Sequence, residues 1–164
     1  MKTRKQGTPY YLHPFAVSEL LKNKGFGVEY QITGLLHDLR EDADVTYAEI
    51  VQICNVEIAD AVELLTKNPG YSMQEYIKGI SENDIAKMTK LADRIHNLSE
   101  IHLAPLEFRE EYVAETKEWY IDLAKGTCFE EDLNSVLRKV ELSLDNRVAS
   151  TNERHPGGTI IGED

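Results

Sequence analysis

A histidine and an aspartate stand side by side at the end of an apolar run, as His37 and Asp38 in the segment LLHDLRED. Two more carboxylates, Glu41 and Asp42, follow four residues later. On one continuous helix, residues four apart share a face, so these four groups are expected on a narrow sector of one helix end. Such crowding is electrostatically costly unless a cation or a solvent-filled cleft compensates it, and a solvated polar face is the alternative.

Two other segments carry residues of the same chemical types. His13 directly precedes Pro14 in GTPYYLHP, so its ring is expected at a fixed helix N-terminus. Asp93 lies in KLADRIHNL, away from the apolar stripe of its predicted helix. With His37 and Asp38 they give two imidazoles and two carboxylates, a mixed donor set that suits manganese, iron or cobalt, with zinc possible. Each could instead be an ordinary helix-start or polar-face residue.

The elements that must position these residues are all predicted to be helices. Apolar residues recur with helical periodicity, no segment shows convincing strand alternation, and Thr46 and Glu49 form a capping box. Helices are expected over residues 14–25, 30–39, 47–54, 57–67, 73–80, 84–102, 105–125 and 130–149. The predicted fold class is therefore all-α.

Length and composition narrow the class of protein. A chain of 164 residues suits one domain, expected over residues 1–149, with the polar and aperiodic residues 150–164 as a disordered tail. No run approaches the ~20 apolar residues of a membrane span, and the basic start lacks the apolar stretch of a signal peptide. Cys54 and Cys128 are expected to be reduced core residues. Together these features predict a cytoplasmic protein without a membrane partner.

The charge balance bears on possible partners. A net charge of −11 argues against general nucleic-acid binding, which needs a basic footprint. It still allows a nucleotide substrate, because the charge close to a site matters more than the total. The oligomeric state does not follow from the sequence.

Three blocks, in order, resemble the HD-domain metal phosphohydrolases. More narrowly, they resemble the hydrolase domain of the alarmone (ppGpp) synthetase/hydrolase family and its small stand-alone hydrolases. The blocks are GTPYYLHP (7–14), LLHDLRED (35–42) and KLADRIHNL (90–98), with a softer match in ADAVELLTK (59–67). The similarity is good through the third block and loose over the last third. The resemblance implies an HD-domain helical bundle with a metal site between its helices.

The resemblance also implies a metal and its ligands. One divalent ion, most naturally Mn²⁺, would be held by four residues: His13, His37, Asp38 and Asp93. Glu41 and Asp42 would lie beside the metal water and take part in hydrolysis, where a carboxylate can orient the water and accept its proton. The alternative for that pair is a solvated acidic helix end.

Residues for the substrate are implied in the same way. Arg4 and Lys5 match the family's Arg-Lys pair, which walls the guanine-nucleotide pocket. Arginine can stack on a base, and lysine can neutralise phosphate. Asn97, one helical turn after Asp93, would contact the nucleotide sugar or a nearby water, unless it is an ordinary polar surface residue.

Four more polar residues lie in or just after the third block. Lys90 and Arg94 flank Asp93, where they could serve phosphate or simply pair with acidic neighbours. His96 and His102 are expected to be structural or surface histidines.

The activity that the resemblance implies is removal of the 3′-pyrophosphate of ppGpp or pppGpp, giving GDP or GTP and pyrophosphate. Two alternatives remain open: an HD phosphatase for another nucleotide, such as a nucleoside monophosphate or a nicotinamide dinucleotide phosphate, and a non-catalytic nucleotide-binding regulatory module. The family normally has a helix ahead of the Arg-Lys pair. This chain starts almost at the pair, so weak substrate affinity is expected. With no room for a synthetase domain, the chain is expected to be a hydrolase only.

Overall fold

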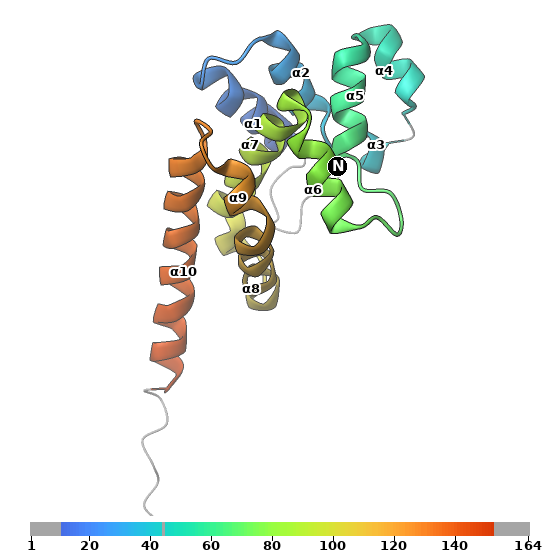
Figure 1. Cartoon of the computed structure of the whole chain (residues 1–164). Helices are drawn as coiled ribbons and strands as arrows, with labels where there is room; N and C mark the ends of the chain where they lie inside the picture. Colours follow the sequence, from blue (N-terminus) through green and yellow to red (C-terminus); the bar gives the residue numbers. More distant parts are fainter. Residues whose placement is uncertain (1–10, 44, 153–164) are drawn as a thin grey trace, which may run out of the picture.

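The computed structural model describes residues 11–43 and 45–152, which form helices and connecting turns without a strand (Figure 1). This confirms the all-α fold class. In order, the elements are α1 (Leu12–Asn23), α2 (Val28–Leu36), α3 (Leu39–Asp42), α4 (Tyr47–Ile53), α5 (Val56–Leu65), α6 (Met73–Ser81), α7 (Asp84–Glu100), η1 (Ile101–Leu103), α8 (Leu106–Glu115), η2 (Thr116–Tyr120), α9 (Ile121–Ala124) and α10 (Glu130–Asn152). None of the helices in these ranges has the length and apolarity needed to cross a membrane.

Helix α7 is the central element of the molecule, because it contacts α1, α2, α5, α6 and α10. Its apolar residues recur three and four apart and so bury a continuous stripe, including Leu91, Ile95 and Leu98. Asp93 and Arg94, between these residues, are buried as well. The same helix therefore supplies part of the core and a buried polar surface.

Helices α1 and α2 approach each other closely, and a glycine makes this possible. A Cβ atom at Gly34 would lie 3.1 Å from the backbone nitrogen of Ser18 in α1 and 3.0 Å from the Leu21 side chain. A side chain there would push the two helices apart. The close packing brings the start of α1, with His13, next to the end of α2, which leads into His37.

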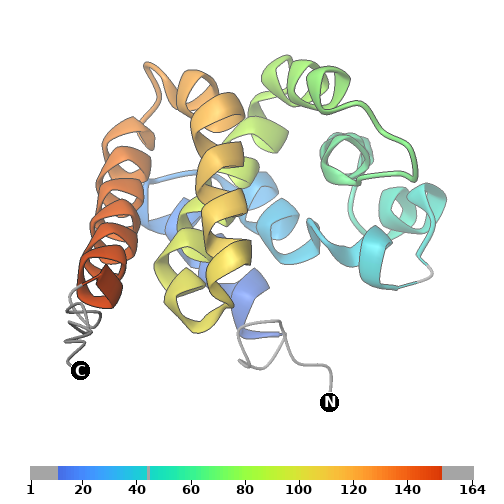
Figure 2. The same cartoon turned by 90° about the horizontal axis from the view of Figure 1, so that it is seen from below.

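The two ends of the molecule are built differently (Figures 1 and 2). At one end, α10 lies beside α8 and α9 and joins the main core through Leu133 and Leu137, together with Phe129 just before the helix. At the other end, α4 and α5 surround a smaller cluster of buried residues made of Ile50, Ile58, Ala59 and Val62. The blocks that carry the candidate ligands lie between these two ends.

The helix predicted over residues 30–39 is interrupted at the residues of greatest interest. Helix α2 ends at Leu36, His37 and Asp38 form a turn, and α3 begins at Leu39. Asp38 has φ −99° and ψ 0°, in the bridge region between helix and strand geometry. The prediction that His37 and Glu41 share one face of a continuous helix is therefore wrong.

The single helix predicted over residues 105–125 is also divided. Helix α8 ends at Glu115, a π-helical turn follows over Thr116–Tyr120, and α9 completes the segment. A π-helical turn adds a residue to the helical repeat and so rotates the side chains that follow it. The capping box at Thr46, by contrast, is confirmed, since both of its hydrogen bonds to Glu49 are present.

Two further expectations meet the structure in part. Cys54 and Cys128 are free thiols, as expected; Cys54 is half-buried against the smaller core cluster, whereas Cys128 is exposed, so the core placement is wrong for Cys128. Their neighbours lie at helix ends, where short apolar runs meet solvent. Helix α10 continues to Asn152. The domain boundary at residue 149 remains a prediction, since residues 153–164 lie outside the described part of the chain.

Candidate metal centre

Three donor atoms from three segments meet in the interior. His13 from α1, His37 from the turn after α2 and Asp93 from α7 are 2%, 2% and 4% exposed. The Nε2 atom of His13 lies 3.2 Å from Nε2 of His37 and 3.0 Å from Oδ1 of Asp93. Nε2 of His37 lies 3.7 Å from the same Asp93 oxygen. Among the described residues, these three form a group able to hold a metal ion.

Asp38 lies at the edge of this group. Its Oδ2 atom is 3.2 Å from Nε2 of His37 and 4.0 Å from Nε2 of His13. Its side chain is one-third exposed, unlike those of the other three. The turn that ends α2 therefore directs two adjacent side chains toward one point, with Asp38 on the solvent side.

The spacing and the chemical types of these donor atoms suit a divalent cation. Two ligands at right angles, each about 2.1 Å from an ion, lie about 3 Å apart, close to the separations between His13 and its two neighbours. Imidazole nitrogens with carboxylate oxygens suit a divalent transition metal. Without a cation, the converging lone pairs of two imidazoles and a carboxylate would have to share protons in a buried space.

Hydrogen bonds behind the two histidines fix the direction of their rings. Nδ1 of His37 lies 2.8 Å from the carbonyl oxygen of Gly34, so a proton on Nδ1 leaves the Nε2 lone pair free. Nδ1 of His13 lies 2.9 Å from Nδ1 of His96. When His13 donates this bond, its Nε2 is likewise left as a donor to a metal.

His96 is the residue of the site that the sequence interpretation missed. It is half-buried rather than on the surface, and its other nitrogen, Nε2, lies 3.9 Å from Oε1 of Glu100. Its position three residues after Asp93 puts both residues on one side of α7, which was the available signal. His96 thus gives the ring of His13 a hydrogen-bond partner that can either accept or donate a proton.

Two neighbours on α7 hold Asp93 in place. Lys90 places Nζ 2.8 Å from Oδ2 of Asp93, and Asn97 donates from Nδ2 to Oδ1 at 2.5 Å. Burial alone would raise the pKa of Asp93, but the charge of Lys90 and the hydrogen bonds from His13 and His37 hold it well below its usual range. Asp93 is therefore an ionised carboxylate with both oxygens directed by α7 itself.

The electrostatics of His37 follow the same logic. Burial lowers the pKa of His37, but the hydrogen bonds and charges of Asp38 and Asp93 outweigh this and raise it to about 10. The two carboxylates thus create a site that attracts positive charge, whether a proton or a metal ion.

Glu41 and Asp42 lie outside this buried group. Both are exposed on the short helix α3. Oε1 of Glu41 accepts a hydrogen bond from the backbone nitrogen of Lys67 at 2.6 Å, which ties α3 to the loop after α5. Arg4 and Lys5, the predicted wall of the nucleotide pocket, lie outside the described residues.

Arg94 points away from the metal centre. Its guanidinium lies between the rings of Tyr112 and Tyr120, 3.9 and 3.8 Å from their centroids, and it pairs with Glu115. Its NH1 group also donates to the hydroxyl of Thr116 at 3.3 Å. Of the two roles considered for Lys90 and Arg94, the structure shows pairing with acidic neighbours for both.

No protein-family model matches the chain. The chain is 33% identical over 129 residues to a guanosine-3′,5′-bis(diphosphate) 3′-pyrophosphohydrolase of Aquifex aeolicus, and 33% identical over 132 residues to a probable enzyme of the same name from a Synechocystis species. In both cases 74% of this chain is matched, but the chain spans only 18% and 17% of those longer relatives.

A shorter relative is covered more fully. The chain is 30% identical over 129 residues to a zebrafish (Danio rerio) guanosine-3′,5′-bis(diphosphate) 3′-pyrophosphohydrolase, matching 74% of this chain and 72% of the relative. A solved structure described as a metazoan ortholog of SpoT that hydrolyses ppGpp superposes with a TM-score of 0.73 at 26% identity. It covers 85% of this chain and 86% of that one. A Listeria monocytogenes protein shares the fold, with a TM-score of 0.64 over 82% of this chain and 98% of that one, at 24% identity.

Proposed function

The chain belongs to the guanosine-3′,5′-bis(diphosphate) 3′-pyrophosphohydrolase family, and from this premise we propose that it removes the 3′-pyrophosphate of ppGpp and pppGpp. The products would be GDP or GTP and pyrophosphate. The observation that carries the proposal is the meeting of His13, His37 and Asp93 in one buried group. These three residues come from the three blocks by which the sequence resembles this family, and their proximity in the structure supports the proposal.

We propose His13, His37, Asp38 and Asp93 as the ligands of one divalent ion, with Mn²⁺ as the metal. Nitrogen and oxygen donors in equal number suit Mn²⁺ better than a thiolate-rich site would. When bound, such an ion lowers the pKa of water and polarises a phosphoryl oxygen. The hydrogen bonds to Gly34 and Asn97 support this assignment, because they direct His37 and Asp93 toward a common point.

The acidic pair of α3, Glu41 and Asp42, is proposed to orient the attacking water and accept its proton. In the reaction, the water oxygen forms a bond to the phosphorus attached to the 3′ oxygen, and the bond between that phosphorus and the 3′ oxygen breaks. Glu41 or Asp42 would take the proton that water loses, and the 3′ oxygen would leave with a proton as a hydroxyl. Their exposure supports this role, since a proton acceptor here remains accessible to solvent and substrate.

Arg4 and Lys5 are proposed to wall the guanine-nucleotide pocket, one by stacking and the other by charge. Asn97 would reach the substrate while holding Asp93, so it would couple nucleotide position to the orientation of a ligand. The expected partner is a small nucleotide rather than a nucleic acid, and the expected location is the cytoplasm.

A nucleotide panel with product analysis tests the proposed activity. The Mn²⁺-loaded chain would be incubated separately with ppGpp, a nucleoside monophosphate and a nicotinamide dinucleotide phosphate, and the released phosphate species identified. Pyrophosphate together with GDP from ppGpp is the expected result. Orthophosphate from another nucleotide, with ppGpp untouched, would replace the proposal by a phosphatase. Tight nucleotide binding without any product would replace it by a regulatory module.

A further inference from the structure

A second polar site lies at the far end of α7, between that helix, α8 and α10. A groove of about 180 Å³ is lined there by apolar and basic residues. Leu98, Ile101, Val136 and Val140 supply its apolar wall, and His102, Arg109 and Lys139 supply the groups able to carry positive charge. No aspartate or glutamate contributes to the lining within residues 11–43 and 45–152. In a chain of net charge −11, this is an unusual concentration of positive charge.

Arg109 is the buried member of this basic set. It is only 7% exposed, and its Nε donates to the carbonyl oxygen of Ala104 at 2.7 Å. In the part of the chain that the structure describes, no carboxylate lies within ion-pair distance of its guanidinium. The Nε bond fixes the plane of the guanidinium, while its two terminal amino groups are left to the groove.

The other buried arginine shows what a structural arginine looks like in this protein. Arg94 is 2% exposed and is closed off by Glu115 and two tyrosine rings. Burying a guanidinium is costly unless a counter-charge compensates it, and Arg94 has that compensation within the fold. Within residues 11–43 and 45–152 Arg109 has no such counter-charge, and an anion in the groove would supply one.

We propose that this groove binds a small organic anion with one carboxylate or phosphate group and a short aliphatic body. Arg109 would bind the anionic group through its paired amino groups, the geometry in which arginine recognises carboxylate and phosphate. Lys139 and His102 add charge at the rim, and the apolar wall takes the aliphatic part. The groove is smaller than the 300–1,000 Å³ typical of drug-sized ligands, so a whole nucleotide is too large.

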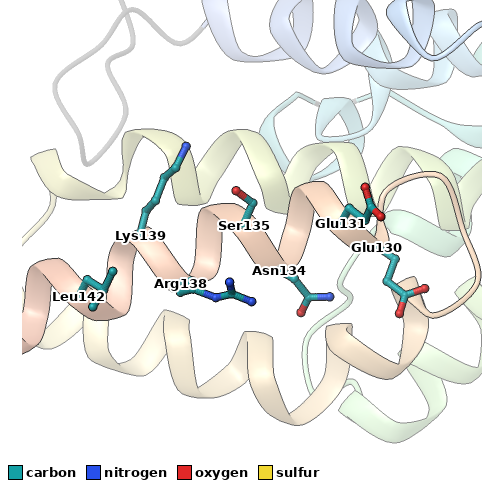
Figure 3. Close-up of a pocket in the computed structure, with 7 residues that line it drawn as sticks. All are labelled: Glu130, Glu131, Asn134, Ser135, Arg138, Lys139 and Leu142. Carbon is teal, nitrogen blue, oxygen red and sulfur yellow. The ribbon is translucent and has the colours of Figure 1, made fainter.

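The neighbouring surface of α10 provides a contrast and a control. Figure 3 shows a broad hollow along this helix in which Glu130 and Glu131 lie with Arg138, so acidic groups are part of its lining. Arg138 and Lys139 leave α10 in different directions. Lys139 lines the groove and Arg138 does not. Substituting Arg138 therefore removes one positive charge close by without altering the proposed site.

Binding of isovalerate and of inorganic phosphate to the full chain tests the proposal, followed by NMR at constant ionic strength. Isovalerate should bind saturably, with a Kd on the order of 1 mM, and shift the resonances of Arg109, Val136 and Val140. Arg109→Gln should weaken binding by about 10- to 100-fold, the range for a hydrogen bond to a charged group. Arg138→Gln should leave it unchanged. Because Arg109→Gln could disturb the fold, Lys139→Gln on the exposed rim provides a second test and should also weaken binding.

Each contrary result overturns a stated part of the proposal. Phosphate binding as tightly as isovalerate would remove the aliphatic body from the assignment. If the folded Arg109→Gln and Lys139→Gln chains both bound isovalerate as tightly as the wild type, Arg109 and Lys139 would have no part in the binding site. A groove that neither isovalerate nor phosphate enters saturably would overturn the site altogether.

Discussion

His37, a proposed metal ligand, and the carboxylates of Glu41 and Asp42 lie close in sequence but in opposite environments. His37 is 2% exposed and held by a backbone carbonyl, whereas Glu41 and Asp42 stand in solvent on the four-residue helix α3. The turn at His37 and Asp38 makes this separation possible, because it ends α2 before α3 begins. A continuous helix would have given all four groups one shared environment.

From this difference we infer that the buried residues bind the metal ion and the exposed carboxylates take part in the reaction. Buried donors with fixed rings are suited to hold an ion, since their geometry changes little when it binds. Exposed carboxylates are suited to exchange protons with water. We therefore expect substitutions in the two regions to have different signatures: loss of metal in the first, and loss of turnover with the metal retained in the second.

The largest effect is expected from Asp38→Ala. This change removes the proposed ligand that lies between the buried group and solvent, so metal and activity should be lost together. Metal content of the purified protein and hydrolysis of ppGpp measure the two effects. Asp122→Ala, an exposed carboxylate on α9 whose side chain is 85% exposed, is the matched control and should change neither. Full metal occupancy in Asp38→Ala would show that Asp38 is not a ligand.

A smaller loss of activity is expected from substitutions of the exposed carboxylates Glu41 and Asp42, and it should occur without loss of the metal. Glu41→Gln and Asp42→Asn should retain the metal while kcat falls by roughly 10²–10⁴-fold, the usual contribution of a positioned acid or base. Glutamine keeps an oxygen that can accept the hydrogen bond from Lys67, so α3 should stay in place. Steady-state kinetics with parallel metal analysis makes the measurement, and Glu57→Gln, at an exposed position in the first turn of α5, is the control. Unchanged rates in both variants would make the pair a solvated helix end.

The contact between His13 and His96 should affect how tightly the buried group binds Mn²⁺ without being essential for binding. His96→Phe removes the partner of Nδ1 and should weaken Mn²⁺ affinity by about 10- to 100-fold, the usual range for a residue that orients a ligand. His96→Asn retains an acceptor and should recover part of that loss. The readout is Mn²⁺ titration followed by electron paramagnetic resonance, with His102→Phe as the control. Equal affinity in His96→Phe and the wild type would reduce this contact to packing.

The smallest effect is expected at the substrate contacts, which belong to neither region. Arg4→Ala and Lys5→Ala should raise KM for ppGpp by about 2- to 10-fold with little change in kcat, because such contacts form equally in the ground state and the transition state. High salt should diminish the contribution of Lys5 more than that of Arg4, if one acts by charge and the other by stacking. A fall in kcat without a change in KM would contradict this assignment.

Local signals predicted local structure well. The capping box at Thr46 and Glu49 needs only residues three apart, and it forms as expected. The periodicity of α7 likewise predicted a long helix, which ends within a few residues of the expected position. The candidate ligands were predicted because their three blocks occur in the order typical of the resembled family, and the structure brings His13, His37 and Asp93 together.

The features that the sequence did not predict involve contacts between segments far apart in the chain. The close approach of α2 to α1 at Gly34, just before the break at His37, is a contact between two segments, and periodicity within one segment does not encode it. The π-helical turn at Thr116–Tyr120 brings Tyr120 to the guanidinium of Arg94, a contact with a residue of α7. His96 was missed for the same reason, since its partner His13 lies 83 residues earlier.

Titration of Mn²⁺ into the metal-free chain in the presence of ppGpp tests the central claim most directly. Bound metal and released phosphate species would be followed in the same sample, the latter by phosphorus NMR. We predict that pyrophosphate and GDP appear in proportion to bound Mn²⁺ and that the rate stops rising when one ion is bound per chain. Release of orthophosphate instead, or a rate that does not depend on bound metal, would contradict the account.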